Sequence, residues 1–185
     1  MSKKSIIPKF NIQIEEQFYI QISITNIIYT TNNNYFSATQ INQHLFLGDK
    51  NDASNIEALH SHNIKHIVNM ANDCEIGLDD DDITVVKYGV NDDPDENITE
   101  ATANATQYIS DCIGKKENVM VVCRVGVSRS ASVVIAFLIQ YENMAYQDAF
   151  DVVKSKRPII SPNFGFCNFL RQISEERKNK LIQSP

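Results

Sequence analysis

The sequence predicts an α/β domain with a central, mostly parallel sheet flanked by helices. From about residue 37 onward, short apolar segments alternate with longer segments whose apolar residues recur at helical spacing. Strands that alternate with helices in this way indicate parallel strands joined by crossover helices. The chain has 185 residues, of which 43% are hydrophobic and 22% charged, which fits one globular domain of ordinary size.

Four apolar segments are expected to form the strands of this sheet. The first ends at Gly48, and the acidic run Asp79–Asp82 is expected to be a solvated turn between the second and the third. The segments are His44–Leu47, His66–Met70, Thr84–Val90 and Val119–Val122.

Helices are expected after these strands, and two of them begin at recognisable caps. Ser54 and Glu57 form a capping box that opens a short helix with Ile56 and Leu59 turned inward. Ser161 as N-cap, with Pro162 in the first helical position, opens the last helix. The remaining helices are expected over Asn97–Cys112, Arg129–Tyr141 and Tyr146–Ser155.

Residues 1–36 differ in composition from the rest and are interpreted as an N-terminal extension. Apolar residues alternate with polar ones from Ile12 to Ile24, which predicts one or two strands. Such a strand either packs on the domain or pairs with a second copy, so a homodimer through this extension is an alternative. The main domain is expected over residues 37–180, followed by a short tail over 181–185.

Charge and composition exclude several classes of partner. Lys and Arg number 17 and Asp and Glu number 23, so the net charge is −6, which argues against a nucleic-acid binder. No apolar run approaches the length of a membrane span, and no secretory signal is recognised, so no membrane partner is expected. Four scattered cysteines fit a reducing compartment, which predicts a cytoplasmic or nuclear location.

The chemistry is concentrated in the segment from Val121 to Ser130, between an apolar strand and an apolar helix. A turn there directs successive backbone N–H groups toward one point, and the following helix N-terminus adds positive potential. Gly126 permits a backbone conformation that a β-branched residue would resist. The segment therefore predicts a cradle for an anion.

Two side chains turn this cradle into a candidate catalytic site. Arg129 follows Cys123 by six residues, and its guanidinium can hold two oxygens of a phosphate. A thiol beside an arginine and a helix N-terminus ionises easily, so Cys123 is expected to be a thiolate. Together these groups indicate covalent catalysis on a phosphate ester.

The pattern Cys123-x5-Arg129-Ser130 resembles the signature of the cysteine-dependent protein tyrosine phosphatase superfamily. Flanking motifs narrow the resemblance to the dual-specificity phosphatases, over about residues 37–178. These motifs are Arg124–Ser132, Arg157–Phe166, and Leu45–Gly48 with Ala53.

The resemblance implies a role for each matching residue. Cys123 would attack phosphorus and form a phosphocysteine intermediate, and Ser130 would help the thiolate to leave when water hydrolyses it. Asn163 would fix the cradle loop through hydrogen bonds. The phosphoryl oxygens would be bound by the Arg129 side chain and by the backbone of Arg124, Val125, Gly126, Val127, Ser128 and Arg129.

The resemblance also requires an aspartic acid that protonates the leaving alcohol, on a loop between a strand and a helix. Family spacing selects Asp92 in the loop from Asn91 to Ile98, with Asp93 as the second choice and Asp95 as the third. No cofactor and no metal are implied.

The chain departs from the family at Val122, where a histidine usually precedes the nucleophile. Valine cannot donate the hydrogen bond of that histidine, so we expect weakened turnover. The expected function is hydrolysis of phosphotyrosine and phosphoserine or phosphothreonine in proteins. The alternative is a pseudophosphatase that binds phosphoproteins with little or no turnover. Phosphoinositides and RNA 5′-phosphates are less favoured because Val125 and Val127 leave the cradle loop apolar.

Overall fold

The computed structural model describes residues 35–183 of the chain, with the side chains of residues 35–180. The strands expected between residues 12 and 24, and any dimer that they would form, lie outside the described residues. The elements are β1 (Thr39–Gln40), β2 (Leu45–Asp49), the 3-10 helix η1 (Asp52–Ser54), α2 (Ile56–Ser61), β3 (Ile64–Ala71), β4 (Thr84–Val90), α3 (Thr99–Gly114), β5 (Asn118–Cys123), α4 (Arg129–Tyr141), α5 (Tyr146–Lys156) and α6 (Phe164–Gln183).

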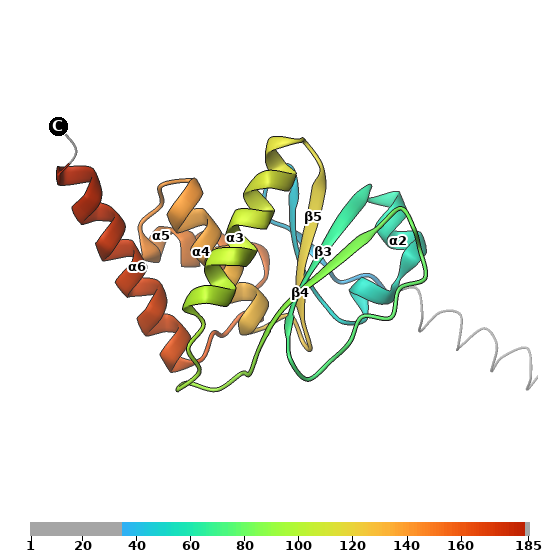
Figure 1. Cartoon of the computed structure of the whole chain (residues 1–185), viewed down its shortest axis with the longest axis horizontal. Coiled ribbons are helices and arrows are strands. Elements are labelled where there is room, and N and C mark those ends of the chain that lie inside the picture. The colour runs from blue at the N-terminus through green and yellow to red at the C-terminus, as the bar shows by residue number, and fades with distance from the viewer. Residues whose placement is uncertain (1–34, 184–185) are drawn as a thin grey trace, which may run out of the picture. The chain divides into compact units, whose positions relative to one another are not determined.

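Five strands form one sheet in the order β1-β2-β5-β3-β4. The pairs β2–β5, β5–β3 and β3–β4 are parallel, and only the two-residue strand β1 pairs antiparallel. The predicted fold class, a mostly parallel sheet flanked by helices, is confirmed (Figure 1). Strand β4 and helix α4 have the bounds that the sequence predicted.

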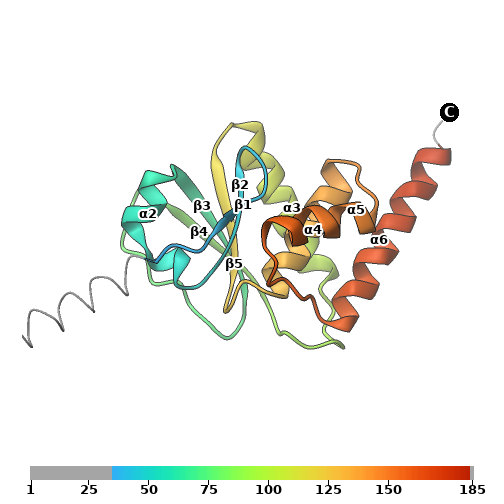
Figure 2. The ribbon, with the colours of Figure 1, turned by 180° about the vertical axis from the view of Figure 1, so that it is seen from behind.

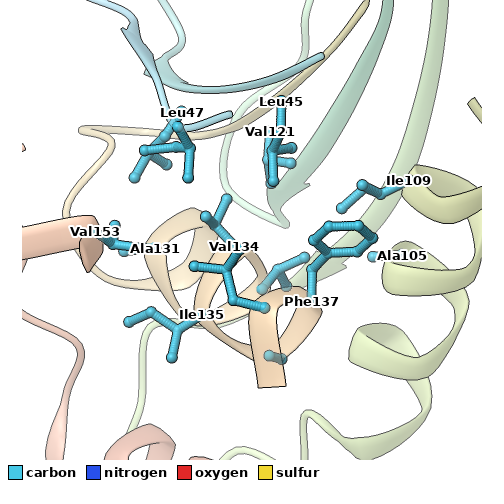
Figure 3. Close-up of a cluster of buried hydrophobic side chains, with 14 of the residues drawn as sticks. Leu45, Leu47, Ala105, Ile109, Val121, Ala131, Val134, Ile135, Phe137 and Val153 are labelled. Atoms are coloured by element: carbon cyan, nitrogen blue, oxygen red, sulfur yellow. The ribbon is translucent and has the colours of Figure 1, made fainter. Parts of the chain in front are cut away.

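Helices cover the two faces of the sheet unequally (Figures 1 and 2). The larger core joins one face to α3, α4, α5 and α6, and a smaller core joins the other face to η1 and α2. Helix α4 lies at the centre of the larger layer, and eleven of its thirteen residues are buried. In Figure 3, Val134 of this helix points toward Leu47 and Val121, and Phe137 lies beside Ile109. A helix that is enclosed on all sides explains the continuous apolar run in this part of the sequence.

The parallel arrangement brings the loops after β3, β4 and β5 to one edge of the sheet, because parallel strands end at the same side. Asn69 of β3 is in register with Val122 of β5, so the two strands finish together. Such an edge, beyond the carboxyl ends of parallel strands, is where ligands bind in α/β sheets.

Both helix starts that were predicted from caps are wrong by one or more residues. The N-cap of α2 is Asn55, whose side chain accepts a hydrogen bond from the Ala58 N–H, whereas the Ser54 hydroxyl donates to the carbonyl of Lys50. As a consequence Leu59 is buried, but Ile56 is 38% exposed and does not point inward.

The last helix begins at Phe164, and not at Ser161 with Pro162 in its first turn. The Asn163 side chain accepts from the Phe166 N–H and takes the capping role. Ser161 is held elsewhere, because its N–H donates to the carbonyl of Val127 at 2.9 Å.

Within residues 35–183, no helix is long and apolar enough to cross a membrane.

Candidate active site

The predicted anion cradle lies between β5 and α4. Cys123 is the last residue of β5 and Arg129 the first of α4, so five residues make the connection. Gly126 at its tip has φ +69°, and a Cβ there would come within 2.6 Å of the Gly48 carbonyl oxygen and of the Arg157 guanidinium. Glycine is therefore required both by backbone conformation and by space.

The outer side of the cradle loop is held by the segment between α5 and α6. The buried Arg157 donates from Nε to the Gly126 carbonyl at 2.9 Å, and from Nη1 to the Ser37 carbonyl at 2.8 Å. The Ser161 N–H binds the Val127 carbonyl, and the Asn163 N–H donates to the Ser128 hydroxyl at 3.2 Å. These contacts turn the loop carbonyls away from the centre of the cradle.

The sulfur of Cys123 lies at the base of the cradle, and the residue is 2% exposed. Burial raises the pKa of the Cys123 thiol. Hydrogen bonds from the Ser130 hydroxyl and from the backbone N–H groups of Ser130, Val125 and Gly126 lower this pKa, and together they outweigh the effect of burial. The Ser130 Oγ donates to the sulfur at 3.2 Å. The net result is a pKa below the ordinary value for cysteine, which favours the thiolate.

Arg129 is only 5% exposed and is held from one side of its guanidinium. Its Nη1 donates to Asp73 and, at 3.2 Å, to the Val90 carbonyl. Its Nε is buried without a hydrogen-bond partner and lies 3.8 Å from an Asp92 oxygen. A buried cationic donor without a partner is costly, and an anion in the cradle would satisfy it.

Asp92 is joined to the cradle through Ser128. The Ser128 hydroxyl donates to Asp92 Oδ1 at 2.6 Å, and the Asn163 side-chain amide donates to the same oxygen at 2.9 Å. The structure thus brings the predicted residues Cys123, Arg129, Ser130, Asp92 and Asn163 together at one edge of the sheet. Neither Asp93 nor Asp95 makes such a contact; Asp93 accepts from the Asp95 N–H within its own loop.

Arg124 contributes to the loop but its side chain points away, since it is 56% exposed and binds Asp73 at 3.0 Å. Val122 is fully buried in the smaller core with residues such as Met120 and Ile67. The position before the nucleophile is therefore filled by an apolar packing contact.

Two residues that matter for this geometry were not singled out from the sequence. Asp73, in the loop after β3, binds both Arg129 and Arg124, and these hydrogen bonds lower its pKa to about 2. Arg157 stood within a motif used for the resemblance, but nothing in the sequence indicated that it binds the cradle loop.

Taken together, the cradle offers a sulfur with a lowered pKa, inward backbone donors and a guanidinium whose Nε makes no hydrogen bond. Such a set can bind a tetrahedral oxyanion and attack its central atom. Among residues 35–183, no group of three or more His, Cys, Asp or Glu side chains is arranged to hold a metal ion.

Comparison with known proteins matches residues 45–176 to the family described as the dual specificity phosphatase catalytic domain. A "probable rhodanese domain-containing dual specificity protein phosphatase" from Dictyostelium discoideum is 38% identical over 150 residues, which are 76% of this chain and 31% of that protein. Dual specificity protein phosphatase 1 of Arabidopsis thaliana is 31% identical over 176 residues, covering 95% of this chain and 86% of that protein. The chain spans about a third of the length of most of the curated relatives that it matches.

Solved structures agree with this similarity. A mouse putative dual specificity phosphatase, complexed with zinc tungstate, has a TM-score of 0.75 and 26% identity, covering 80% of this chain and 92% of that chain. A human "tyrosine phosphatase-like serine/threonine/tyrosine-interacting protein" has a TM-score of 0.68 and 30% identity, covering 78% of this chain and 97% of that chain.

Replacing Gly126 by alanine should destabilise the fold by about 2 kcal/mol, because a positive φ and a backbone clash are both forced on the new side chain. Gly114→Ala is the matched control, since nothing lies within 4 Å of its added Cβ at the end of α3. That control should be neutral or slightly stabilising. Urea unfolding gives the free energy of unfolding of each variant. Equal values for Gly126→Ala and Gly114→Ala would show that the loop does not require glycine at position 126.

Ser130→Ala should raise the pKa of the Cys123 thiol by about one unit, since a hydrogen bond to a charged group is lost. The measurement is the pH at which inactivation by iodoacetate reaches half of its maximal rate. Ser161→Ala removes a hydroxyl from an exposed position of the adjoining segment and should leave that pH unchanged. An unchanged midpoint in Ser130→Ala would show that its hydroxyl does not stabilise the thiolate.

Asp73 should contribute to stability above pH 4 and lose that contribution as the pH falls toward 2, because its pKa is lowered from 3.8 to about 2 in the folded state. The free energy of unfolding of Asp73→Asn should therefore fall less between pH 5 and pH 2 than that of the unmodified protein. Asp79→Asn, an exposed residue of the β3–β4 turn, is the control for the change of net charge. Parallel curves for all three proteins would refute the contribution of Asp73.

Proposed function

This chain belongs to the dual specificity phosphatase catalytic-domain family, and we propose that it hydrolyses phosphotyrosine and phosphoserine or phosphothreonine in proteins. Protein substrates are favoured over phosphoinositides and RNA 5′-phosphates because the cradle loop is apolar at Val125 and Val127 and the chain is acidic overall. The observation that carries the proposal is the buried Arg129 Nε, which makes no hydrogen bond, beside a sulfur whose pKa is lowered by the Ser130 hydroxyl and by backbone N–H groups.

In the first step, the Cys123 thiolate attacks phosphorus, forming a sulfur–phosphorus bond as the bond from phosphorus to the ester oxygen breaks. Asp92 gives its proton to that oxygen, and the alcohol leaves. The Arg129 guanidinium and the backbone N–H groups from Arg124 to Arg129 bind the three other phosphoryl oxygens. Donors held in place for charge that develops in the transition state lower the barrier without further reorganisation.

In the second step, water attacks the phosphocysteine and the sulfur leaves as a thiolate. The Asp92 carboxylate takes a proton from the attacking water, so the general acid of the first step is regenerated. The Ser130 hydroxyl, 3.2 Å from the sulfur, donates to the leaving thiolate. Phosphate then dissociates and the site is restored.

Val122 supports a second candidate function, a pseudophosphatase that captures phosphoproteins without turnover. Its side chain offers the loop no hydrogen bond where the family usually has histidine. A relative at 30% identity is itself described as phosphatase-like and interacting. The intact Cys123, Arg129 and Asp92 oppose this candidate, because a protein that only binds phosphate does not need a nucleophile and an acid.

The deciding experiment is hydrolysis of p-nitrophenyl phosphate by the unmodified protein and by Cys123→Ser, with a metal chelator present. We expect turnover that persists in chelator, is inhibited by vanadate and is lost in the variant. Turnover by the unmodified protein no faster than that of Cys123→Ser would refute the proposed enzymatic function. Tight binding of a phosphopeptide without turnover would then favour the pseudophosphatase.

Asp92→Ala should slow hydrolysis of phenyl phosphate about a hundredfold or more, because its poor leaving group needs a proton. Hydrolysis of p-nitrophenyl phosphate should fall much less, since its leaving group departs as a stable anion. The two rates are compared at one pH. Asp93→Ala is the control, and it should change the rates on both substrates by the same factor. Equal losses on both substrates would remove Asp92 from the general-acid role.

A further inference from the structure

A groove of about 380 Å³ lies between the loop after β4 and the first turns of α6. One wall is formed by residues 94–99, and the other by Phe164, Gly165 and neighbouring residues of α6. Both segments lie at the lower end of the molecule in Figure 1. The two walls touch at Gly165, where an added Cβ would meet the Pro94 carbonyl oxygen.

The two segments that form the groove walls start next to residues of the phosphate cradle. Asp92 precedes one wall by two residues, and Asn163 immediately precedes the other. The Asn163 side-chain amide donates to Asp92 Oδ1 at 2.9 Å, so the two walls are joined beside the cradle. A chain whose phosphorylated residue occupies the cradle can therefore lay a neighbouring residue in the groove.

Apolar side chains are exposed on the segments that surround the cradle. Val125 of the cradle loop is 58% exposed, Ile159 of the α5–α6 segment 56%, and Phe164 at the groove wall 74%. They are half of the large apolar side chains that are exposed among the described residues. Exposed apolar surface around a site is typical of contact with a macromolecule.

The groove is also negatively charged. Asp95 and Glu96 belong to its lining, and the described lining residues include no Lys, Arg or His. Glu96 is partly buried and accepts a hydrogen bond from Asn91 at 3.0 Å, which fixes its carboxylate within the loop. An apolar ring beside two carboxylates complements a side chain with an aliphatic stem and a cationic end.

We propose that this groove binds a Lys or Arg side chain that flanks the phosphorylated residue of the protein substrate. The inference rests on the proposed function and adds a preference in the substrate sequence. The aliphatic stem lies against Phe164, and the cation interacts with Asp95 and Glu96. The same acidic groove disfavours an acidic residue at that place in the substrate, by repulsion between like charges.

The test is a set of phosphotyrosine peptides, neutral except for one residue, in which Arg, Gln or Glu is moved through the positions flanking the phosphotyrosine. At one or two adjacent positions, Arg should raise kcat/KM about fivefold over Gln, as expected of a partly exposed charge pair with some packing, and Glu should lower it. Affinity of the same peptides for Cys123→Ser, measured by fluorescence anisotropy, should follow the same order.

Two variants connect any such preference to the groove. Glu96→Gln keeps an acceptor for Asn91 but removes the charge, and should lose most of the preference for Arg. Glu100→Gln makes the same change in the exposed first turn of α3, outside the groove lining, and should keep the preference. Phe164→Ala should reduce affinity for the Arg and Gln peptides alike, by removing the apolar wall.

Hydrolysis of p-nitrophenyl phosphate separates the two proposals, because this substrate is too small to reach the groove. If the unmodified protein, Glu96→Gln, Glu100→Gln and Phe164→Ala all hydrolyse it, and an Arg residue gives the peptides no advantage at any position, the groove proposal is wrong. A preference for Arg that is as large in Glu96→Gln as in the unmodified protein would also overturn the groove proposal. If p-nitrophenyl phosphate is not hydrolysed, the proposed function fails, and anisotropy with the peptides still decides whether the groove selects a basic residue.

Discussion

The site depends on the direction in which one short loop presents its backbone. Between Cys123 and Arg129, the N–H groups that lower the pKa of the sulfur are directed inward only because the carbonyls are held outward. Arg157 holds part of the loop in this way, since its guanidinium binds the carbonyls of both Gly126 and Ser37, and Ser37 lies 120 residues before Arg157 in the chain. With the carbonyls turned inward, the same loop would repel both a thiolate and a phosphate. The positive φ of Gly126 is the local cost of the arrangement.

A second set of contacts holds the proposed general acid Asp92 and the phosphate-binding Arg129 in place beside the cradle. The Ser128 hydroxyl accepts from the Asn163 backbone and donates to Asp92, so three loops from distant parts of the chain share one hydroxyl. Asp73 binds one nitrogen of Arg129 and leaves Nε without a hydrogen bond. The cradle is thereby fixed before a substrate arrives, which reduces the reorganisation that the reaction requires. Because these contacts do not involve Val122, the cradle keeps its geometry without a histidine at that position.

The sequence predicted well those features that short-range patterns determine. The bounds of β4 and α4 follow from an apolar segment and from helical spacing, and the cradle was recognisable because its nucleophile and arginine are six residues apart. Helix starts were less predictable: Ser54 and Asn55 are adjacent candidates for a cap, and the choice between Ser161 and Asn163 depends on contacts with the cradle loop. The contact of Asp73 with Arg129 spans 56 residues and arises only when β3 and β5 pair, so no local pattern contains it.

The central claim is that the sulfur of Cys123 forms a covalent bond to phosphorus during turnover. Acid quenching of the protein within milliseconds of mixing with an aryl phosphate, followed by peptide mass spectrometry, tests it most directly. We expect a phosphoryl group on the peptide that contains Cys123, at an early time and in less than stoichiometric amount as turnover proceeds. Turnover with no phosphoryl group on that peptide at any quench time, or with the group on another residue, would contradict it.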